Sequence, residues 1–311
     1  MPASALFPIH LRWLYLAHSS PPAPPDAPRL PSWLRVKTGK ARLCGHTRDL
    51  LAQHGLQTVC DNARCPNIGE CYSRQTATFL IMGSHCTRDC GFCAVRHGAP
   101  EALDPTEPER LAAAAGNLGL RYVVVTSVTR DDLPDGGAAH FAATIRALHA
   151  AGIRGVEVLT PDFQGDREAL RAVLESRPTV FNHNVETVRS LCPTVRPQAG
   201  YDRSLQVLRD ARELAPDIRR KSGLMVGLGE TDEQIMELLR DLYAAGCQIL
   251  TIGQYLRPSR LQLPVQCYVE PAQFEQYAAW GHEIGLEHVL AGPFVRSSYR
   301  AAEVVPGFEI A

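Results

Sequence analysis

The chain has 311 residues, 45% of them hydrophobic and 21% charged, which fits one large or two small globular domains. Its 32 Lys and Arg balance 33 Asp and Glu, and the formal charge of -1 gives no support for a protein that coats nucleic acid. No uninterrupted apolar run reaches the roughly 20 residues that a spanning helix needs. We therefore expect a soluble protein with neither a nucleic acid nor a membrane as its partner.

Residues 1–31 are predicted to be a poorly ordered extension. Six prolines lie within residues 21–31, and proline blocks both regular helix and ladder pairing. The apolar stretch at residues 5–16 is short, and its single arginine, Arg12, is weak support for a transit peptide.

From residue 77 onward, short β-branched runs alternate with stretches of helical period, which is the pattern of βα units around a parallel sheet. Six strands are expected, at residues 78–82, 122–126, 156–159, 179–182, 223–226 and 249–252. Capping boxes of Thr106 with Glu109 and of Thr231 with Gln234 predict two helix starts. The repeated units indicate an α/β barrel or partial barrel. A doubly wound sheet is the alternative, and the missing phosphate-loop glycine pattern disfavours it.

Polar side chains follow nearly every expected strand. In barrels of this kind the chemistry lies where the strands end, so their recurrence outlines a lined cavity. The residues concerned are Thr126, Ser127, Thr160, Asp162, Asn182, Asn184, Gly227 to Glu230, Gln254 and Arg257.

Six of the ten cysteines fall within 34 residues. A disulfide framework suits short secreted chains, whereas this chain is large and shows no secretory signal. Metal ligation is the favoured interpretation.

Cys86, Cys90 and Cys93 form a CxxxCxxC motif after the first expected strand. Zinc usually takes four ligands, commonly as two CxxC pairs, and no second pair follows at that spacing. Three thiolates on a 4Fe-4S cluster leave one iron open for a further ligand. With Phe92 before the last cysteine, the motif resembles that of the radical S-adenosylmethionine (SAM) superfamily. The resemblance implies that SAM binds the open iron and is cleaved to a carbon radical.

Cys60, Cys65 and Cys71 form a second set, spaced CxxxxCxxxxxC, just before the expected barrel. A structural zinc site completed by His46, His54 or His85 is the alternative to a second iron-sulfur cluster.

Longer blocks then resemble the lipoyl synthase family over about residues 32–301. They include CPNIGEC at 65–71, CTRDCGFC at 86–93, VVVTSVTRDDLPDGGA at 123–138, KSGLMVGLGET at 221–231 and AGPFVRSSYRA at 291–301. The resemblance implies a partial TIM-type (β/α)6 radical SAM barrel at 77–290. An N-terminal auxiliary-cluster segment at 32–76 and a C-terminal segment at 291–311 with an RSSY motif would flank it.

The resemblance also implies site residues. Cys60, Cys65 and Cys71 would hold an auxiliary 4Fe-4S cluster, with Ser298 as fourth ligand and Ser297 as the alternative. This cluster is the family's sulfur source, and a serine oxygen is more readily displaced than a thiolate.

Contacts with SAM are expected from the strand ends. Asn184 and Glu186 could bind the ribose or the methionyl amine, and Lys221 or Arg257 could pair with a carboxylate. The glycine-rich strand end at Gly227 could approach the ligand closely. No role is assigned to His183 or to the isolated cysteines, which are Cys44, Cys192, Cys247 and Cys267.

The implied activity is the insertion of two sulfur atoms at carbons 6 and 8 of an octanoyl group on a lysine of a lipoyl carrier domain. Implied partners are the E2 subunits of 2-oxoacid dehydrogenases, the glycine cleavage H protein, and a flavodoxin or ferredoxin electron donor. A cytoplasmic monomer is expected. The alternatives are a biotin synthase-like sulfur-inserting enzyme and a non-catalytic zinc-binding module. Gln262 stands where the family often has His, which leaves open whether residue 262 helps to dock the substrate.

Overall fold

The computed structural model describes residues 30–34, 41–73 and 77–308. The expectation for the N-terminal extension therefore lies outside the described residues, apart from Leu30 and Pro31. Within the described ranges, no helix has the length and apolar character needed to cross a bilayer.

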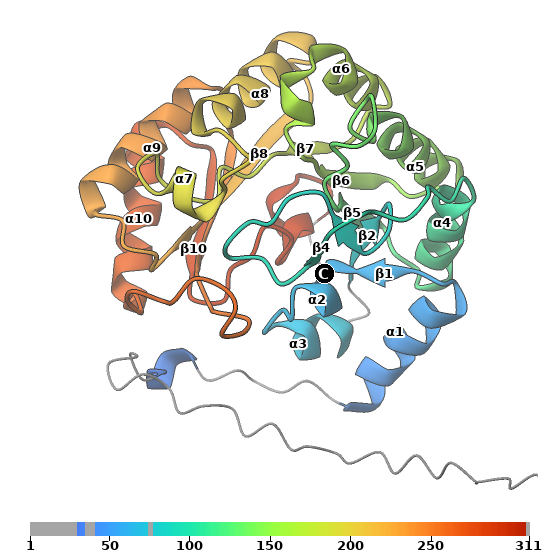
Figure 1. The fold of residues 1–311 in the computed structure, drawn as a ribbon, viewed down its shortest axis with the longest axis horizontal. Coiled ribbons are helices and arrows are strands. Elements are labelled where there is room, and N and C mark those ends of the chain that lie inside the picture. The colour runs from blue at the N-terminus through green and yellow to red at the C-terminus, as the bar shows by residue number, and fades with distance from the viewer. Residues whose placement is uncertain (1–29, 35–40, 74–76, 309–311) are drawn as a thin grey trace, which may run out of the picture.

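One eight-stranded sheet forms the centre of the molecule, in the order β1-β2-β5-β6-β7-β8-β9-β10 (Figure 1). The strands from β2 to β10 are parallel, and β1 joins β2 in the antiparallel sense. The bounds are β1 Gln57–Thr58, β2 Thr78–Ile81, β5 Tyr122–Ser127, β6 Gly155–Leu159, β7 Val180–Asn182, β8 Arg219–Val226, β9 Ile249–Gln254 and β10 His288–Gly292.

All six expected strands are confirmed, as β2 and β5 to β9. Strand β10, which pairs parallel with β9, was not predicted from the sequence. Its sequence HVLAG has a single β-branched residue, and all five residues are only half-buried, so the apolar signal of a central strand is absent. Strand β10 also spans the boundary predicted at residue 290.

Helices cover the outer face of the curved sheet, so the βα units follow one another around an open ring (Figure 1). Among the described residues β1 and β10 are not hydrogen-bonded to each other, and the sheet is a partial barrel. The helices are α4 Glu107–Asn117, α5 Ala138–Ala150, α6 Arg167–Glu175, α8 Tyr201–Leu214, α9 Asp232–Ala244 and α10 Pro271–Ile284. Short connections are η2 Phe163–Gly165 and α7 Cys192–Val195.

One of the two predicted capping boxes is confirmed. Thr231 and Gln234 cap α9 reciprocally. The box at Thr106 is wrong, because the Thr106 hydroxyl and N–H both donate to Asp104 Oδ1, at 2.7 and 2.9 Å, and Thr106 makes no side-chain cap bond.

The N-terminal and C-terminal segments lie together at the sheet. The former contains η1 Ser32–Leu34, α1 Ala41–Gln53, α2 Val59–Asn62 and α3 Ile68–Ser73, and the latter ends in η3 Ala301–Val304. Asn67 Nδ2 donates to the Phe294 carbonyl at 2.6 Å, and the Tyr299 hydroxyl donates to Glu70 Oε1 at 3.2 Å. These bonds hold the second cysteine set beside the RSSY motif.

The last described residues close one end of the barrel. Val305 packs with Val180 and Ile249, and the Phe308 ring lies 5.2 Å from that of Tyr122. Val180, Ile249 and Tyr122 are the first residues of their strands. The C-terminal segment therefore fills the amino end of the barrel and leaves its carboxyl end open for a site.

Candidate active site

A cavity of about 530 Å³ lies at the carboxyl ends of the strands. Its walls are mainly apolar, with Leu80, Leu159 and Leu224 from β2, β6 and β8. Members of both cysteine sets and both serines of the RSSY motif line this one cavity: Cys60, Cys65, Cys86, Cys90, Cys93, Ser297 and Ser298. Within the described residues, no three His, Cys, Asp or Glu side chains form a group that could hold a metal ion as they stand.

The CxxxCxxC loop begins in β3 His85–Cys86, which pairs with β4 Arg96–His97. Cys86 Sγ accepts from the N–H groups of Arg88 and Thr129, at 3.4 and 3.2 Å. Burial raises the pKa of Cys90 to about 11 and that of Cys93 to about 12. These thiols stay protonated until a cation replaces the proton, which is how a metal centre binds cysteine.

Gln262 holds this loop. Its side-chain amide donates to the Cys93 carbonyl at 3.1 Å, and the Leu263 N–H donates to the Gly91 carbonyl at 2.8 Å. A Cβ atom on Gly91 would lie 2.9 Å from Leu263 Cδ1, so a larger residue here would require the Leu263 side chain to shift. The side chain of Gln262 therefore stabilises the cysteine loop.

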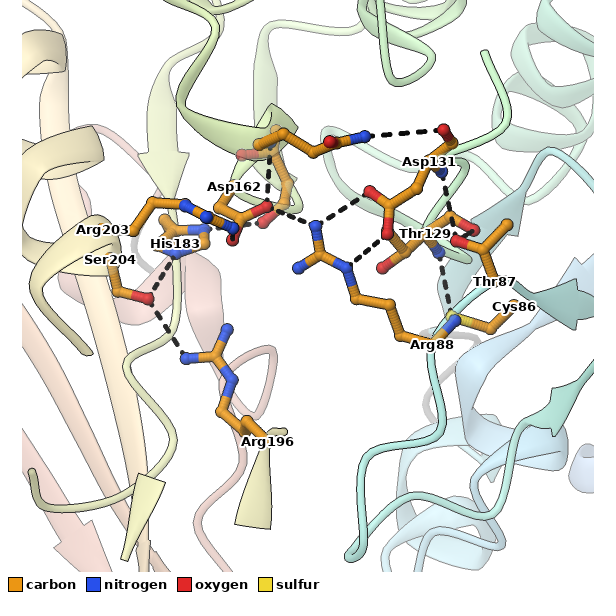
Figure 2. A network of polar contacts seen from close by, with 12 residues as sticks. Cys86, Thr87, Arg88, Thr129, Asp131, Asp162, His183, Arg196, Arg203 and Ser204 are labelled. Atoms are coloured by element: carbon orange, nitrogen blue, oxygen red, sulfur yellow. Dashed lines mark hydrogen bonds and ion pairs between the residues drawn. The ribbon is translucent and has the colours of Figure 1, made fainter. Parts of the chain in front are cut away.

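Arg88, inside the motif, ties the cysteine loop to two strand-end loops (Figure 2). Its buried guanidinium makes a bidentate pair with Asp131 at 2.7 and 2.8 Å and a third bond to Asp162 at 2.6 Å. Burial alone would raise the pKa of Asp162, but hydrogen bonding and charge from Arg88 outweigh it and lower the pKa to about 2. This network holds the cysteine loop against the loops that follow β5 and β6.

His183 belongs to the supporting frame of the cavity. Its Nδ1 contacts the Thr160 carbonyl and its Nε2 the Ser204 hydroxyl, both at 3.0 Å (Figure 2). Burial lowers its pKa to about 4, so the imidazole is neutral at pH 7. Arg196 Nη1 donates to the Val185 carbonyl at 2.9 Å and to Ser204 Oγ at 3.2 Å. The guanidinium of Arg196 is thereby fixed at the cavity wall.

A polar cradle lies where β7 and β8 end. Asn184 Nδ2 donates to Glu186 Oε1 at 2.9 Å and to Ser297 Oγ at 2.6 Å. Glu186 has a positive φ of 65°, a conformation that non-glycine residues adopt at a cost and that clusters at functional sites. A Cβ on Gly223 would lie 2.6 Å from Thr251 Oγ1 and 2.9 Å from Asn184 Oδ1, so only glycine keeps the cradle open.

Three residues that line this cavity have a buried side-chain atom without a hydrogen-bond partner within the described chain: Ser127 Oγ, Thr160 Oγ1 and Asn184 Oδ1. An unpaired buried polar group costs about 1–3 kcal/mol unless a ligand or water satisfies it. Together with the thiols, these groups fit a polar ligand such as SAM beside an iron-sulfur cluster.

Thr78 connects the two halves of the second cysteine set. Its hydroxyl donates to Ser298 Oγ at 2.7 Å, and it also hydrogen-bonds the Cys60 thiol. Burial raises the pKa of Cys60 to about 11, and the contacts with Thr78 oppose that rise. The two adjacent serines therefore face different partners: Ser298 lies on the Cys60 side and Ser297 on the Asn184 side.

Arg296 lines the cavity near Cys65. Burial lowers the pKa of Arg296, and electrostatic attraction to the sulfur of Cys65 opposes this. Its Nη1 donates to the Val295 carbonyl at 2.6 Å, and no carboxylate of the described residues lies within ion-pair distance of it. A buried guanidinium without a paired carboxylate favours an anionic group in this part of the cavity.

Lys221 and Gly227 lie apart from the cradle, although both were expected to contact SAM. Lys221 Nζ pairs with Glu157 Oε1 at 2.8 Å, and both side chains are almost fully buried. Gly227, with φ 98°, donates its N–H to Glu230, and a Cβ there would meet Gln254 and the Cys267 carbonyl. Neither lines the cavity, which disfavours both expected contacts.

Arg257 and Cys71 differ in their relation to the cavity. Arg257 lines the cavity at its exposed rim, and its Nε donates to the Gln262 carbonyl at 2.8 Å. Cys71 lies on α3, outside the residues that line the cavity.

Four residues of the site had no role predicted from the sequence: Thr78, Arg88, Arg196 and Arg296. Arg88 and Arg296 lie inside the quoted CTRDCGFC and RSSY motifs, so their positions next to candidate ligands were a usable signal. Thr78 and Arg196 gain their importance through contacts across the fold, which no local pattern encodes.

Comparison with known proteins supports a common origin. Residues 80–242 match the family model of the Radical SAM superfamily. A protein named lipoyl synthase from Caldanaerobacter subterraneus subsp. tengcongensis is 55% identical over 273 residues, covering 88% of this chain and 96% of the relative. Another of that name, from Thermus thermophilus, is 53% identical, covering 91% and 88%.

Solved structures share the fold. Streptococcus suis SuiB bound to S-adenosylmethionine has a TM-score of 0.55 and 13% identity, covering 74% of this chain and 54% of SuiB. Methylornithine synthase (PylB) has a TM-score of 0.50 and 14% identity, covering 83% and 87%. The sequence relatives at this identity and coverage decide the family: the chain belongs to the lipoyl synthase family of radical SAM enzymes, whose cofactors are SAM and 4Fe-4S clusters.

Proposed function

We propose that the chain inserts two sulfur atoms, at carbons 6 and 8, into an octanoyl group carried on a lysine of a lipoyl carrier domain. The single observation that carries this proposal is that thiols of both cysteine sets and both RSSY serines line one cavity. A radical source and a sulfur source can therefore act on the same alkyl chain.

Cys86, Cys90 and Cys93 hold the cluster to which SAM binds, and their motif leaves one iron without a cysteine. When bound, this cluster and SAM supply a carbon radical that removes hydrogen from an unactivated carbon. Asn184 and Glu186 bind the polar groups of SAM, because they form the cradle beside Gly223. The apolar wall excludes water and competing hydrogen donors.

The second cluster is a substrate in this reaction, because its sulfide ends in the product. Cys60, Cys65, Cys71 and Ser298 hold it. Ser298 is preferred over Ser297 because its Oγ lies 2.7 Å from Thr78 Oγ1, and Thr78 in turn contacts Cys60. A serine ligand is displaced more easily than a thiolate as sulfur leaves.

The carriers are the E2 subunits of 2-oxoacid dehydrogenases and the glycine cleavage H protein, and a flavodoxin or ferredoxin supplies electrons. Each of the two alternative functions predicts a different experimental result. A biotin synthase-like enzyme would use another sulfur source, and a zinc module would contain zinc without acid-labile sulfide.

The deciding experiment is mass spectrometry of an octanoyl-lysine peptide after anaerobic incubation with cluster-loaded protein, SAM and a strong reductant. The auxiliary cluster is assembled from heavy-isotope sulfide. Dithiolated peptide carrying the isotope is expected. Dithiolated peptide without it would contradict the auxiliary cluster as sulfur source, and 5'-deoxyadenosine without any thiolated peptide would contradict the octanoyl substrate.

A further inference from the structure

Exposed arginine side chains lie at the opening of the cavity. Among the described residues that line it, the exposed ones are Arg64 and Arg257. Arg260 and Leu261 follow on the loop after Arg257, and Leu261 is 93% exposed. Arg64 has no carboxylate of the described chain within ion-pair distance. The rim is therefore cationic, with one projecting apolar side chain.

The loop that carries Leu261 is held in place. Ser259 Oγ donates to Gln262 Oε1 at 2.6 Å, and Arg257 Nε donates to the Gln262 carbonyl at 2.8 Å. Gln262 also bonds to the Cys93 carbonyl. A single exposed leucine is unremarkable on a protein surface. This one stands on a fixed loop that is joined directly to the cysteine motif.

Arg64 occupies a backbone position that favours glycine. It follows α2, and the Cys65 N–H donates to the Cys60 carbonyl at 2.9 Å while the Arg64 N–H donates to the Asp61 carbonyl at 3.1 Å. This is the Schellman pattern, in which the residue at the position of Arg64 adopts a left-handed conformation and is usually glycine. Its φ is 52°, a conformation that a residue with a Cβ adopts at an energetic cost. Arginine at this position lowers the stability of the fold relative to glycine, which indicates that its side chain has a function.

We propose that Arg64 and the 257–261 loop form the docking surface for the carrier domain, and that Arg64 binds carboxylates next to the octanoyl-lysine. The inference rests on the proposed function, because a group attached to a folded domain reaches the cavity only if that domain sits on the mouth. The complement of a cationic rim with a projecting leucine is an acidic surface with a small apolar patch. Charges at such a rim steer association and set its salt dependence.

The test compares Arg64→Gly with the control Arg177→Gly. Arg177 is also an exposed arginine with a positive φ, 63°, after the end of a helix, but it pairs with Asp217 and lies outside the cavity lining. The cluster-loaded proteins are titrated with octanoylated H protein and with a short uncharged octanoyl-lysine peptide. For each substrate, two quantities are measured at low and high salt. They are the dissociation constant and the substrate concentration that gives the half-maximal single-turnover rate.

Arg64→Gly is expected to weaken binding of H protein about threefold to tenfold at low salt, with the difference lost at high salt. Affinity for the uncharged peptide is expected to stay the same. Because glycine relieves the backbone at this position, the melting temperature should not fall. Leu261→Ser should also weaken H protein binding and spare the peptide, and Arg64→Lys should retain most of the affinity.

Equal H protein affinities of Arg64→Gly and Arg177→Gly would overturn the docking surface. An equal loss for H protein and peptide would also overturn it, because Arg64 would then act inside the cavity. Failure of the wild-type protein to thiolate either substrate would instead refute the proposed function, and the binding data would still decide the docking surface.

Discussion

Thr78 donates its hydroxyl to Ser298 at 2.7 Å, across 220 residues of sequence. Thr78 begins β2 and also contacts Cys60, so a strand end brings the RSSY motif to the second cysteine set. The neighbouring Ser297 accepts from Asn184 instead. Two adjacent serines thus belong to two different parts of the site.

Replacing Ser298 by Ala should therefore affect the auxiliary cluster selectively. We expect Ser298→Ala to change the Mössbauer spectrum of the second cluster and to reduce sulfur insertion at least tenfold, while cleavage of SAM continues. Ser297→Ala is the matched control and should keep the cluster spectrum while weakening SAM binding through the Asn184 cradle. The opposite pattern would exchange the roles of the two serines.

Asp131 and Asp132 offer a second matched pair. Asp131 holds the buried Arg88 of the cysteine loop, whereas Asp132 holds Arg130. Asp131→Asn should lower the free energy of unfolding by about 1–3 kcal/mol and broaden the EPR spectrum of the reduced SAM-binding cluster, because the loop loses a bidentate anchor. Asp132→Asn should cost a similar amount, because it also removes the bidentate partner of a buried guanidinium, but it should leave the spectrum unchanged because Arg130 lies outside the cysteine motif. Identical spectra for all three proteins would show that the contact of Asp131 with Arg88 does not position the loop, since Arg88 keeps its bond to Asp162.

Lys221 tests a structural role against a binding role. Lys221→Met leaves the Glu157 carboxylate buried without its cation, and we expect a loss of about 3–5 kcal/mol in unfolding free energy. Affinity for SAM per folded molecule should not change, since Lys221 lies outside the cavity lining. The double variant Glu157→Gln with Lys221→Met should recover part of the stability. A loss of SAM affinity per folded molecule would show that Lys221 contributes to SAM binding.

His183 should make stability depend on pH. Its pKa falls from an ordinary value near 6.5 to about 4 in the fold, so the unfolded chain binds more protons between these values. The stabilisation is complete above about pH 6.5 and is lost as the pH falls toward 4, with a total of about 3 kcal/mol. The difference in unfolding free energy between wild type and His183→Gln, measured from pH 7.5 to 5, should shrink as the pH falls. A constant difference would contradict the neutral buried imidazole.

The sequence predicted the elements whose signal is local. The central residues of runs such as YVVVTS at β5 are buried, and on α9 the buried residues recur at helical spacing: Ile235, Leu238, Leu239 and Leu242. The cysteine motifs could also be identified from the sequence, because the residue type and the short spacing are local features. Strand β10 was missed because its half-buried residues carry no strong apolar or β-branched signal.

Only the tertiary structure decided which distant groups meet. The sequence by itself determined the family, the parallel βα order and both cysteine sets, since each depends on residue types at fixed spacing. The fold decided that Lys221 pairs with Glu157, that Gln262 supports the Cys93 loop, and that the two RSSY serines face different partners. These outcomes depend on strand register and on which charges burial forces together, and a linear pattern of residues contains neither.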